Sequence, residues 1–188
     1  RYTNEKFIFL DEHIDRLYSG AEALSIDIGL SKEQLINLLF KLMKKNDMTS
    51  DVHIRLIITR GLKRTPYQHP NANIGSSSIV IIPEYKIADK KVNNSGIILS
   101  LVNTVRSTKE ILDPRINSLS KLNCILACIE AENLNVDEGL MLDINGYVST
   151  CNSTNFFMIK NKELWTSSGQ YCLNGVTRGK VIEICENE

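Results

Sequence analysis

The residues with the clearest chemical use lie near the end of the chain, in the run Leu173-Asn174-Gly175-Val176-Thr177-Arg178. Apolar residues with helical spacing follow this run, which predicts a helix that begins near Val176. The first N–H groups of a helix have no partner inside the helix, so they can bind an anion such as a phosphate. The alternative is an ordinary helix start that Thr177 caps. Spacing alone leaves both interpretations open.

Short strands and tight turns are predicted before this helix. Apolar runs at 140–142, 147–148, 156–159 and 164–166 are separated by polar bends. The Asn145-Gly146 pair favours positive φ and marks a turn. These features predict a set of short strands that leads into the helix.

The order of these motifs resembles that of a known family. Asp-x-x-Gly-Tyr-Val, Asn-Phe-Phe, Leu-Trp-Thr and Leu-x-Gly-Val-Thr-Arg follow one another as in the class IV aminotransferases. This family uses pyridoxal 5'-phosphate (PLP) and includes the branched-chain aminotransferases, D-amino acid aminotransferase and aminodeoxychorismate lyase. The resemblance covers nearly the whole chain and implies PLP as cofactor, amino acid and 2-oxo acid substrates, and a homodimer.

The resemblance also implies an α+β fold of two domains. We expect a small α/β domain at 1–105, an interdomain linker at 106–114, and part of the larger cofactor-binding domain at 115–188. The first residue is not Met, and the opening strands and the C-terminal part of the family's cofactor domain are missing. We therefore expect an internal fragment.

Arg16 is the candidate for binding the cofactor phosphate from the first domain. A helix is predicted from Glu12 to about Leu24, and Arg16 lies off its apolar stripe, as a solvated arginine also would. The segment Asp-Glu-His-Ile-Asp-Arg-Leu resembles the family segment whose arginine turns towards the phosphate, and a guanidinium pairs well with phosphate oxygens. With Val176 and Thr177, Arg16 would complete the phosphate site.

Two further arginines are candidates for binding the substrate carboxylate. The strand predicted at 52–61 alternates, with His53, Arg55 and Ile57 on one face, and it leads to Arg60. The branched-chain enzymes resemble this chain at Arg55, and D-amino acid aminotransferase resembles it at Arg60. Because both arginines are present, the subfamily stays open. An exposed pair of strand arginines is the alternative.

The chain departs from the family at the two positions that matter most for PLP chemistry. Apolar spacing predicts a helix at 116–131, and the family lysine that forms the Schiff base corresponds to Asn117, which cannot form an imine. The family glutamate that faces the pyridine nitrogen corresponds to Thr150, which supplies no charge. Lys121 lies one predicted helical turn beyond Asn117 and could replace the missing lysine, although a surface lysine is the commoner role.

Composition limits the other classes of function. The net charge is zero and the pI is near 7, which argues against nucleic-acid or membrane-surface binding through bulk charge. No apolar run is long enough to span a bilayer. The five cysteines show no metal-ligand spacing, so we expect no metal, free thiols and a cytoplasmic location.

The leading prediction is an aminotransferase-like protein that moves an amino group from a branched-chain or D-amino acid to a 2-oxo acid through PLP, using either Lys121 as the catalytic amine or an unusual mechanism. One alternative is a non-catalytic homologue that binds PLP or another anionic metabolite without a Schiff base. Another is an enzyme like aminodeoxychorismate lyase, since one fold serves both chemistries.

Overall fold

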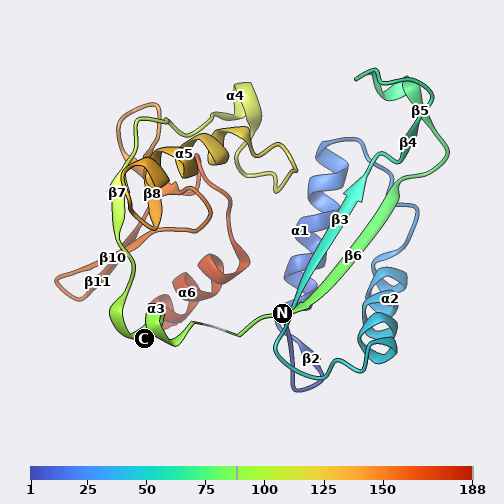
Figure 1. The fold of residues 1–188 in the computed structure, drawn as a ribbon, viewed down its shortest axis with the longest axis horizontal. Helices are drawn as coiled ribbons and strands as arrows, with labels where there is room; N and C mark the ends of the chain where they lie inside the picture. Colours follow the sequence, from blue (N-terminus) through green and yellow to red (C-terminus); the bar gives the residue numbers. More distant parts are fainter. Residues whose placement is uncertain (88, 188) are drawn as a thin grey trace. The chain divides into compact units, whose positions relative to one another are not determined.

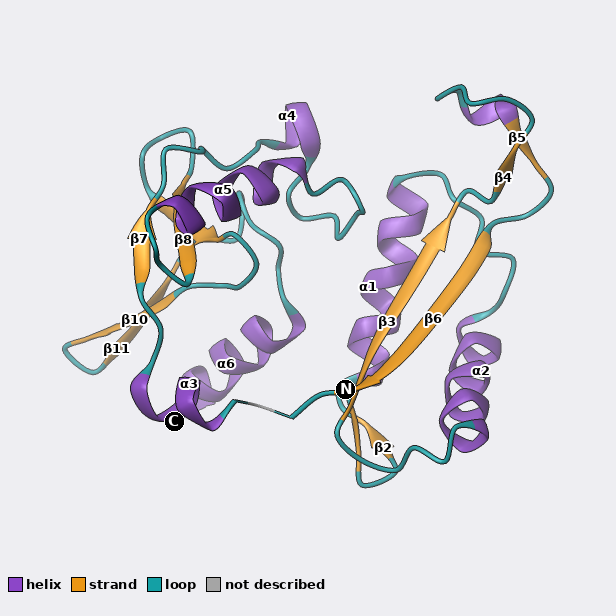
Figure 2. Cartoon of the chain, viewed as in Figure 1, coloured by secondary structure: helices purple, strands orange, loops and turns teal. Residues whose placement is uncertain are grey.

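A computed structural model describes residues 1–87 and 89–187, which divide into two compact units, Arg1–Ala88 and Asp89–Glu188 (Figure 1). The first unit contains α1 (Leu10–Ala23), α2 (Lys32–Lys45), β1 (Tyr2–Thr3), β2 (Lys6–Phe7), β3 (Val52–Thr59), β4 (Leu62–Lys63), β5 (Asn73–Ile74) and β6 (Ser78–Tyr85). The second contains α3 (Lys90–Ser95), α4 (Lys109–Leu112), α5 (Leu122–Asn133), α6 (Val176–Asn187), β7 (Leu99–Leu101), β8 (Glu138–Leu142), β9 (Val148–Cys151), β10 (Phe157–Lys160) and β11 (Glu163–Thr166). Figure 2 shows this mixture of helices and strands, which confirms the predicted α+β class.

The first unit is a twisted antiparallel sheet with two helices on one face. The strand order is β2-β1-β3-β6. Ile14 of α1 and Leu35 and Leu39 of α2 are buried against inward residues of β3 and β6, among them Leu56 and Ile81. The Ser31 hydroxyl and the Gln34 side chain form a capping box at the start of α2. Both helices therefore cover the same side of the sheet.

The second unit is built around α5 and a three-stranded sheet. β7 pairs in parallel with β8, and β8 pairs in antiparallel with β9. Val102, Ala127 of α5 and Met141 of β8 form its buried core. At Gly139 a Cβ atom would lie 2.7 Å from a Val102 methyl group and 3.0 Å from the Ala127 carbonyl oxygen. Glycine therefore lets α5 approach β8 closely.

β7 belongs to the second unit. Leu99 of β7 lies opposite Glu138 of β8, and the Arg106 N–H donates to the Leu142 carbonyl at 2.8 Å. Residues 106–114, predicted as an interdomain linker, also lie in the second unit. The two compact units divide after residue 88.

Glu130 on α5 holds the segment that leads to Arg106. Its carboxylate accepts hydrogen bonds from the Asn103 N–H at 2.6 Å, from the Thr104 N–H at 2.9 Å, and from the Thr104 hydroxyl. The hydrogen bond from the Thr104 hydroxyl, followed by that from the Asn103 N–H, lowers the pKa of Glu130 below its ordinary value. The carboxylate therefore stabilises this segment only while it is ionised.

We expect the stabilisation that the Glu130 carboxylate provides to be lost on acidification. Since the pKa of Glu130 is lower in the folded state, its contribution is fully present above the unfolded pKa of about 4.3 and is lost as the pH falls through the folded pKa. The Glu130→Gln variant should therefore be less stable at neutral pH and lose less stability between neutral and acidic pH. Urea unfolding at several pH values measures this, with Glu132→Gln on the exposed side of α5 as the control. Parallel pH profiles for wild type and Glu130→Gln would contradict it.

No helix among the described residues is both long and apolar enough to cross a bilayer.

Candidate active site

The segment that carries Asn117 and Lys121 is a loop and not the predicted helix. α5 begins only at Leu122. Before it, the Asp113 carboxylate accepts the Arg115 N–H at 3.0 Å, and the Ser118 hydroxyl accepts the Ser120 N–H at 3.3 Å. Such local bonds from side chain to backbone compete with helix formation. The prediction that Asn117 and Lys121 share a helical face is therefore wrong.

The two side chains nevertheless meet. The Lys121 ammonium donates to the Asn117 side-chain oxygen at 3.0 Å, and both residues are exposed. The loop brings the amine to the tip of the Asn117 side chain, which the resemblance aligns with the family's lysine. A primary amine is thus accessible at the place where the resemblance to the family implies a Schiff base.

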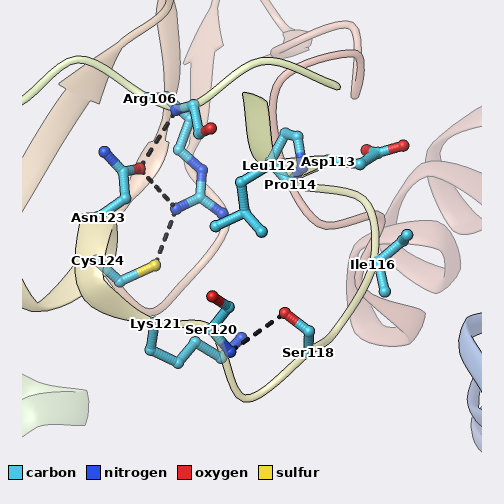
Figure 3. Close-up of a pocket in the computed structure, with 11 residues that line it drawn as sticks. Arg106, Leu112, Asp113, Pro114, Ile116, Ser118, Ser120, Lys121, Asn123 and Cys124 are labelled. Carbon is cyan, nitrogen blue, oxygen red and sulfur yellow. Dashed lines mark hydrogen bonds between the residues drawn. The ribbon is translucent and has the colours of Figure 1, made fainter. Parts of the chain in front are cut away.

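Arg106 and the start of α5 line a small cavity of about 20 Å³ next to this amine (Figure 3). Its wall mixes polar and apolar residues and carries two cationic side chains and one carboxylate: Arg106, Ser107, Leu112, Asp113, Pro114, Ile116, Ser118, Ser120, Lys121, Asn123 and Cys124. The Nη1 group of Arg106 donates to the Asn123 side-chain oxygen at 3.4 Å and to the Cys124 sulfur at 2.8 Å. Sequence reasoning missed Arg106 because it fell in the predicted linker.

Thr150 lies on β9, opposite Met141 of β8, and its side chain is only 5% exposed. The hydroxyl donates to the Thr154 carbonyl at 2.7 Å. The single proton of the hydroxyl is therefore committed, and only its lone pairs can receive another hydrogen bond. The neighbouring Ser149 hydroxyl donates to the Tyr171 carbonyl at 2.9 Å, which ties this strand to the loop before α6.

The predicted helix after Gly175 is present as α6, and it begins at Val176. Its first N–H groups have no partner within the helix, and the Thr177 side chain is exposed beside them. A Cβ atom at Gly175 would lie 2.5 Å from the Asn155 side-chain oxygen, so the loop packs directly on Asn155. The Asn155 amide also donates to the Leu173 carbonyl at 3.0 Å. The start of α6 is therefore held in place and open to an anion.

Arg178 supports the same loop from inside the helix. One terminal nitrogen donates to the Ser167 carbonyl at 2.6 Å and the other to the Asn174 side-chain oxygen at 3.2 Å. Its planar guanidinium thus joins the two ends of the loop that leads into Val176 and Thr177. The arginine of the Gly-Val-Thr-Arg motif was the sequence signal for this positioning role, which sequence reasoning did not use.

In the first unit, Arg16 lies on α1 and is half-buried. One of its terminal nitrogens is 3.5 Å from the Nδ1 atom of His13. Burial lowers the pKa of Arg16. Burial, followed by the positive charge of Arg16, also lowers the pKa of His13, so a neutral imidazole beside the guanidinium is favoured. Arg16 is therefore a partly desolvated cation.

The structure gives the two candidate carboxylate-binding arginines different surroundings. Arg60 donates to the Ser25 carbonyl at 3.1 Å and to the Leu24 carbonyl, so it satisfies the carbonyls that follow α1. Arg55 is exposed on β3, opposite Ile82 of β6, on the sheet face away from the helices. Among the described residues, Arg55 has no side-chain hydrogen bond or ion pair. Arg60 already has a structural role, and Arg55 does not.

The contacts thus bring together Asn117 and Lys121, with Arg106 lining the adjoining cavity. Val176 and Thr177 lie at the start of α6 and Thr150 on β9, all in the same unit. Arg16, Arg55 and Arg60 lie in the other unit. Each unit offers cationic or N–H donors that suit an anionic molecule.

Comparison with known proteins gives the context for this site. The model of the family named Amino-transferase class IV matches residues 1–188. The chain is 38% identical over 185 residues to the Arabidopsis thaliana branched-chain-amino-acid aminotransferase-like protein 2, covering 97% of this chain and 33% of that protein. It is 34% identical over 180 residues to a Methanocaldococcus jannaschii protein assigned as a branched-chain-amino-acid aminotransferase, covering 95% of this chain and 61% of that protein. The chain thus spans between a third and three-fifths of these relatives.

Solved structures share the fold. The Escherichia coli branched-chain amino acid aminotransferase has a TM-score of 0.86 at 24% identity, covering 95% of this chain and 59% of that one. The branched-chain amino acid aminotransferase from Thermobaculum terrenum, solved in its PLP form, has a TM-score of 0.85 at 19% identity, covering 98% and 61%. A Legionella pneumophila protein assigned as a 4-amino-4-deoxychorismate lyase has a TM-score of 0.84 at 23% identity, covering 100% and 67%.

The family model matches the full length of the chain, and the motif order and the fold agree with it. The chain belongs to the class IV aminotransferase family.

Proposed function

We propose that the protein transfers an amino group from a branched-chain amino acid to a 2-oxo acid with PLP as cofactor, and that the amine of Lys121 acts in place of the missing lysine. The observation that carries the proposal is the 3.0 Å contact between the Lys121 ammonium and the Asn117 side-chain oxygen. The names of the relatives support the branched-chain assignment over the D-type one.

PLP can be recognised at its phosphate, its aldehyde and its pyridine nitrogen, and the residues present suit the first two. In the second unit, the open start of α6 with the Thr177 hydroxyl suits a phosphate. In the first unit, the partly desolvated guanidinium of Arg16 suits a phosphate as well. The exposed amine of Lys121 suits the aldehyde end. When bound, PLP supplies an electron sink for the carbanion that forms at Cα of an amino acid. Lys121 would hold the cofactor and move the proton at Cα.

Thr150 weakens this chemistry without preventing binding. Its hydroxyl donates to the Thr154 carbonyl, so only its lone pairs face other groups. A hydroxyl without charge keeps a pyridine nitrogen protonated less effectively than a carboxylate does. We therefore expect a slow enzyme. A homodimer in the cytoplasm is part of the proposal.

The phosphate-binding role of Arg16 and Thr177 predicts a loss of cofactor affinity. In the full-length protein, the double variant Arg16→Ala, Thr177→Ala removes one charge-assisted partner and one hydroxyl, and should raise the dissociation constant for PLP by about tenfold or more. Titration followed by PLP absorbance measures this, and Arg64→Ala on an exposed loop is the control. Unchanged binding would remove the phosphate assignment.

A lyase that acts on a chorismate-like amine is the second candidate, because the Legionella pneumophila lyase shares the fold. Product analysis separates the two functions. The full-length protein is incubated with PLP and either leucine plus 2-oxoglutarate or 4-amino-4-deoxychorismate. Formation of glutamate from the first pair supports the proposal, whereas turnover of the second alone supports the lyase. A non-catalytic role, favoured by Asn117 and Thr150 together, would leave both substrates unchanged.

A further inference from the structure

The hydroxyl group of Thr150 has a fixed orientation, which one carbonyl group sets. This hydroxyl donates to the Thr154 carbonyl at 2.7 Å, and the Cys151 N–H donates to the same oxygen at 3.0 Å. Donors of two adjacent residues thus converge on one acceptor. Because the proton of the Thr150 hydroxyl points towards this carbonyl, its oxygen can only accept a further hydrogen bond.

Glu138 on β8 anchors the loop that carries this carbonyl. One oxygen of its carboxylate accepts the Ser153 hydroxyl at 2.8 Å, and the other accepts the Thr154 hydroxyl at 2.6 Å. Hydrogen bonds to an ionised acceptor are stronger than bonds between neutral groups. The preceding residue is tied to the same strand, because the Asn152 N–H donates to the Gly139 carbonyl at 3.0 Å. The loop after β9 is therefore fastened to β8, and Glu138 holds its two hydroxyl groups.

The negative charge of Glu138 also acts on β9. Burial, followed by the charge of Glu138, raises the pKa of the Cys151 thiol to about 11. Thr150 precedes Cys151 in the chain and is only 5% exposed, so little water screens a charge beside it. The field that opposes a thiolate at Cys151 favours a positive charge in its place.

We propose that Glu138 is a positioning residue for the cofactor: through Thr154 it keeps the Thr150 hydroxyl in its acceptor-only orientation, which selects the protonated pyridine nitrogen of PLP. A neutral pyridine nitrogen is itself an acceptor and finds no donor on this hydroxyl, whereas a protonated one donates to its oxygen. The inference rests on the proposed function, because it requires that Thr150 faces the ring of bound PLP. Glu138 then provides indirectly part of the bias that a carboxylate at position 150 would provide directly.

The orientation of Thr150 is tested first in the full-length protein without PLP. Glu138→Ala removes the acceptor of both loop hydroxyl groups, so the Thr154 carbonyl should be held less firmly. We expect the Cys151 amide hydrogen to exchange with solvent about tenfold faster or more, and the methyl signal of Thr150, identified by its loss in Thr150→Val, to shift. Glu163→Ala, which removes another hydrogen-bonded carboxylate of the same unit, should change neither. Unaltered Cys151 exchange, or an unmoved Thr150 signal, would overturn the proposal.

The protonation of the ring is then recorded with PLP that carries ¹⁵N at its pyridine nitrogen. The wild type should give the signal of a protonated nitrogen, and Glu138→Ala should move this signal towards the unprotonated position. Thr154→Val loses only the hydroxyl that Glu138 accepts and should act in the same direction, even if Glu138→Ala fails to fold. In a Thr150→Val background, replacing Glu138 should have no further effect, because the acceptor is already gone.

These signals separate the inference from the proposed function. Transamination is not measured, so a ring signal that depends on Glu138 supports the inference even if Lys121→Ala keeps full activity. A ring signal that is the same in wild type and Glu138→Ala contradicts the inference alone, even if Lys121 proves to be the reacting amine. Failure of the full-length protein to bind PLP would remove both.

Discussion

Replacement of Lys121 by alanine is expected to abolish covalent capture of PLP and to reduce any transamination by roughly 10²–10⁴-fold, the range that a positioned proton-transfer group contributes. Asn117 has no basic nitrogen, and Lys121 supplies the only amine that the described contacts place against it, at 3.0 Å. The variant should fold normally, because Lys121 is exposed and precedes α5. Turnover of leucine with 2-oxoglutarate in the full-length protein measures the effect.

Two further variants make this prediction specific. Lys109→Ala removes an exposed lysine from the same unit, where its ammonium lies 3.8 Å from the Glu110 carboxylate, and should leave turnover unchanged. Asn117→Lys returns an amine to the family position and should restore turnover in the Lys121→Ala background. Full activity of Lys121→Ala alone would place the reacting amine elsewhere.

Introducing a carboxyl group by Thr150→Glu is expected to destabilise the free protein much more than the PLP-bound protein. Thr150 is 5% exposed, so an ionised carboxylate there lacks both water and a partner. The free energy of unfolding should fall by roughly 2–4 kcal/mol without PLP. With PLP bound, the pyridine nitrogen becomes the partner of the carboxylate, and much of this loss should be recovered.

The matched control for this prediction is Thr150→Gln, because glutamine has nearly the same shape as glutamate but no charge. Both variants lose the Thr150 hydrogen bond to the Thr154 carbonyl, so both should be destabilised without PLP. Only Thr150→Glu should show an enhanced rise of the melting temperature on adding PLP. Burial also raises the pKa of the new carboxyl group, so its penalty should shrink as the pH falls below that pKa. Equal PLP responses of the two variants would show that position 150 does not face the pyridine nitrogen.

Local sequence signals predicted much of the fold. The spacing of apolar residues located α6, which begins at Val176 as predicted. Alternation on β3 correctly separated Arg55 from the inward residues that pack against the helices. These features depend on residues close together in the chain, which is why the sequence alone reveals them.

The errors arose where distant residues decide the structure. The pairing of β7 with β8 could not be predicted, because the two strands lie nearly 40 residues apart in the chain. The predicted helix at 116–131 began too early because the Asp113 and Ser118 side chains form local bonds with the backbone. The different roles of Arg60 and Arg106 could not be predicted, because both are arginines. Arg60 donates to the carbonyls that follow α1, whereas Arg106 lines a cavity.

The central claim is that the amine of Lys121 replaces the missing lysine. The most direct test treats the full-length protein and PLP with sodium borohydride and maps the fixed adduct by mass spectrometry. The proposal predicts a single phosphopyridoxyl adduct on Lys121, accompanied by a change in the absorption spectrum. Tight PLP binding with no adduct on Lys121 would contradict it.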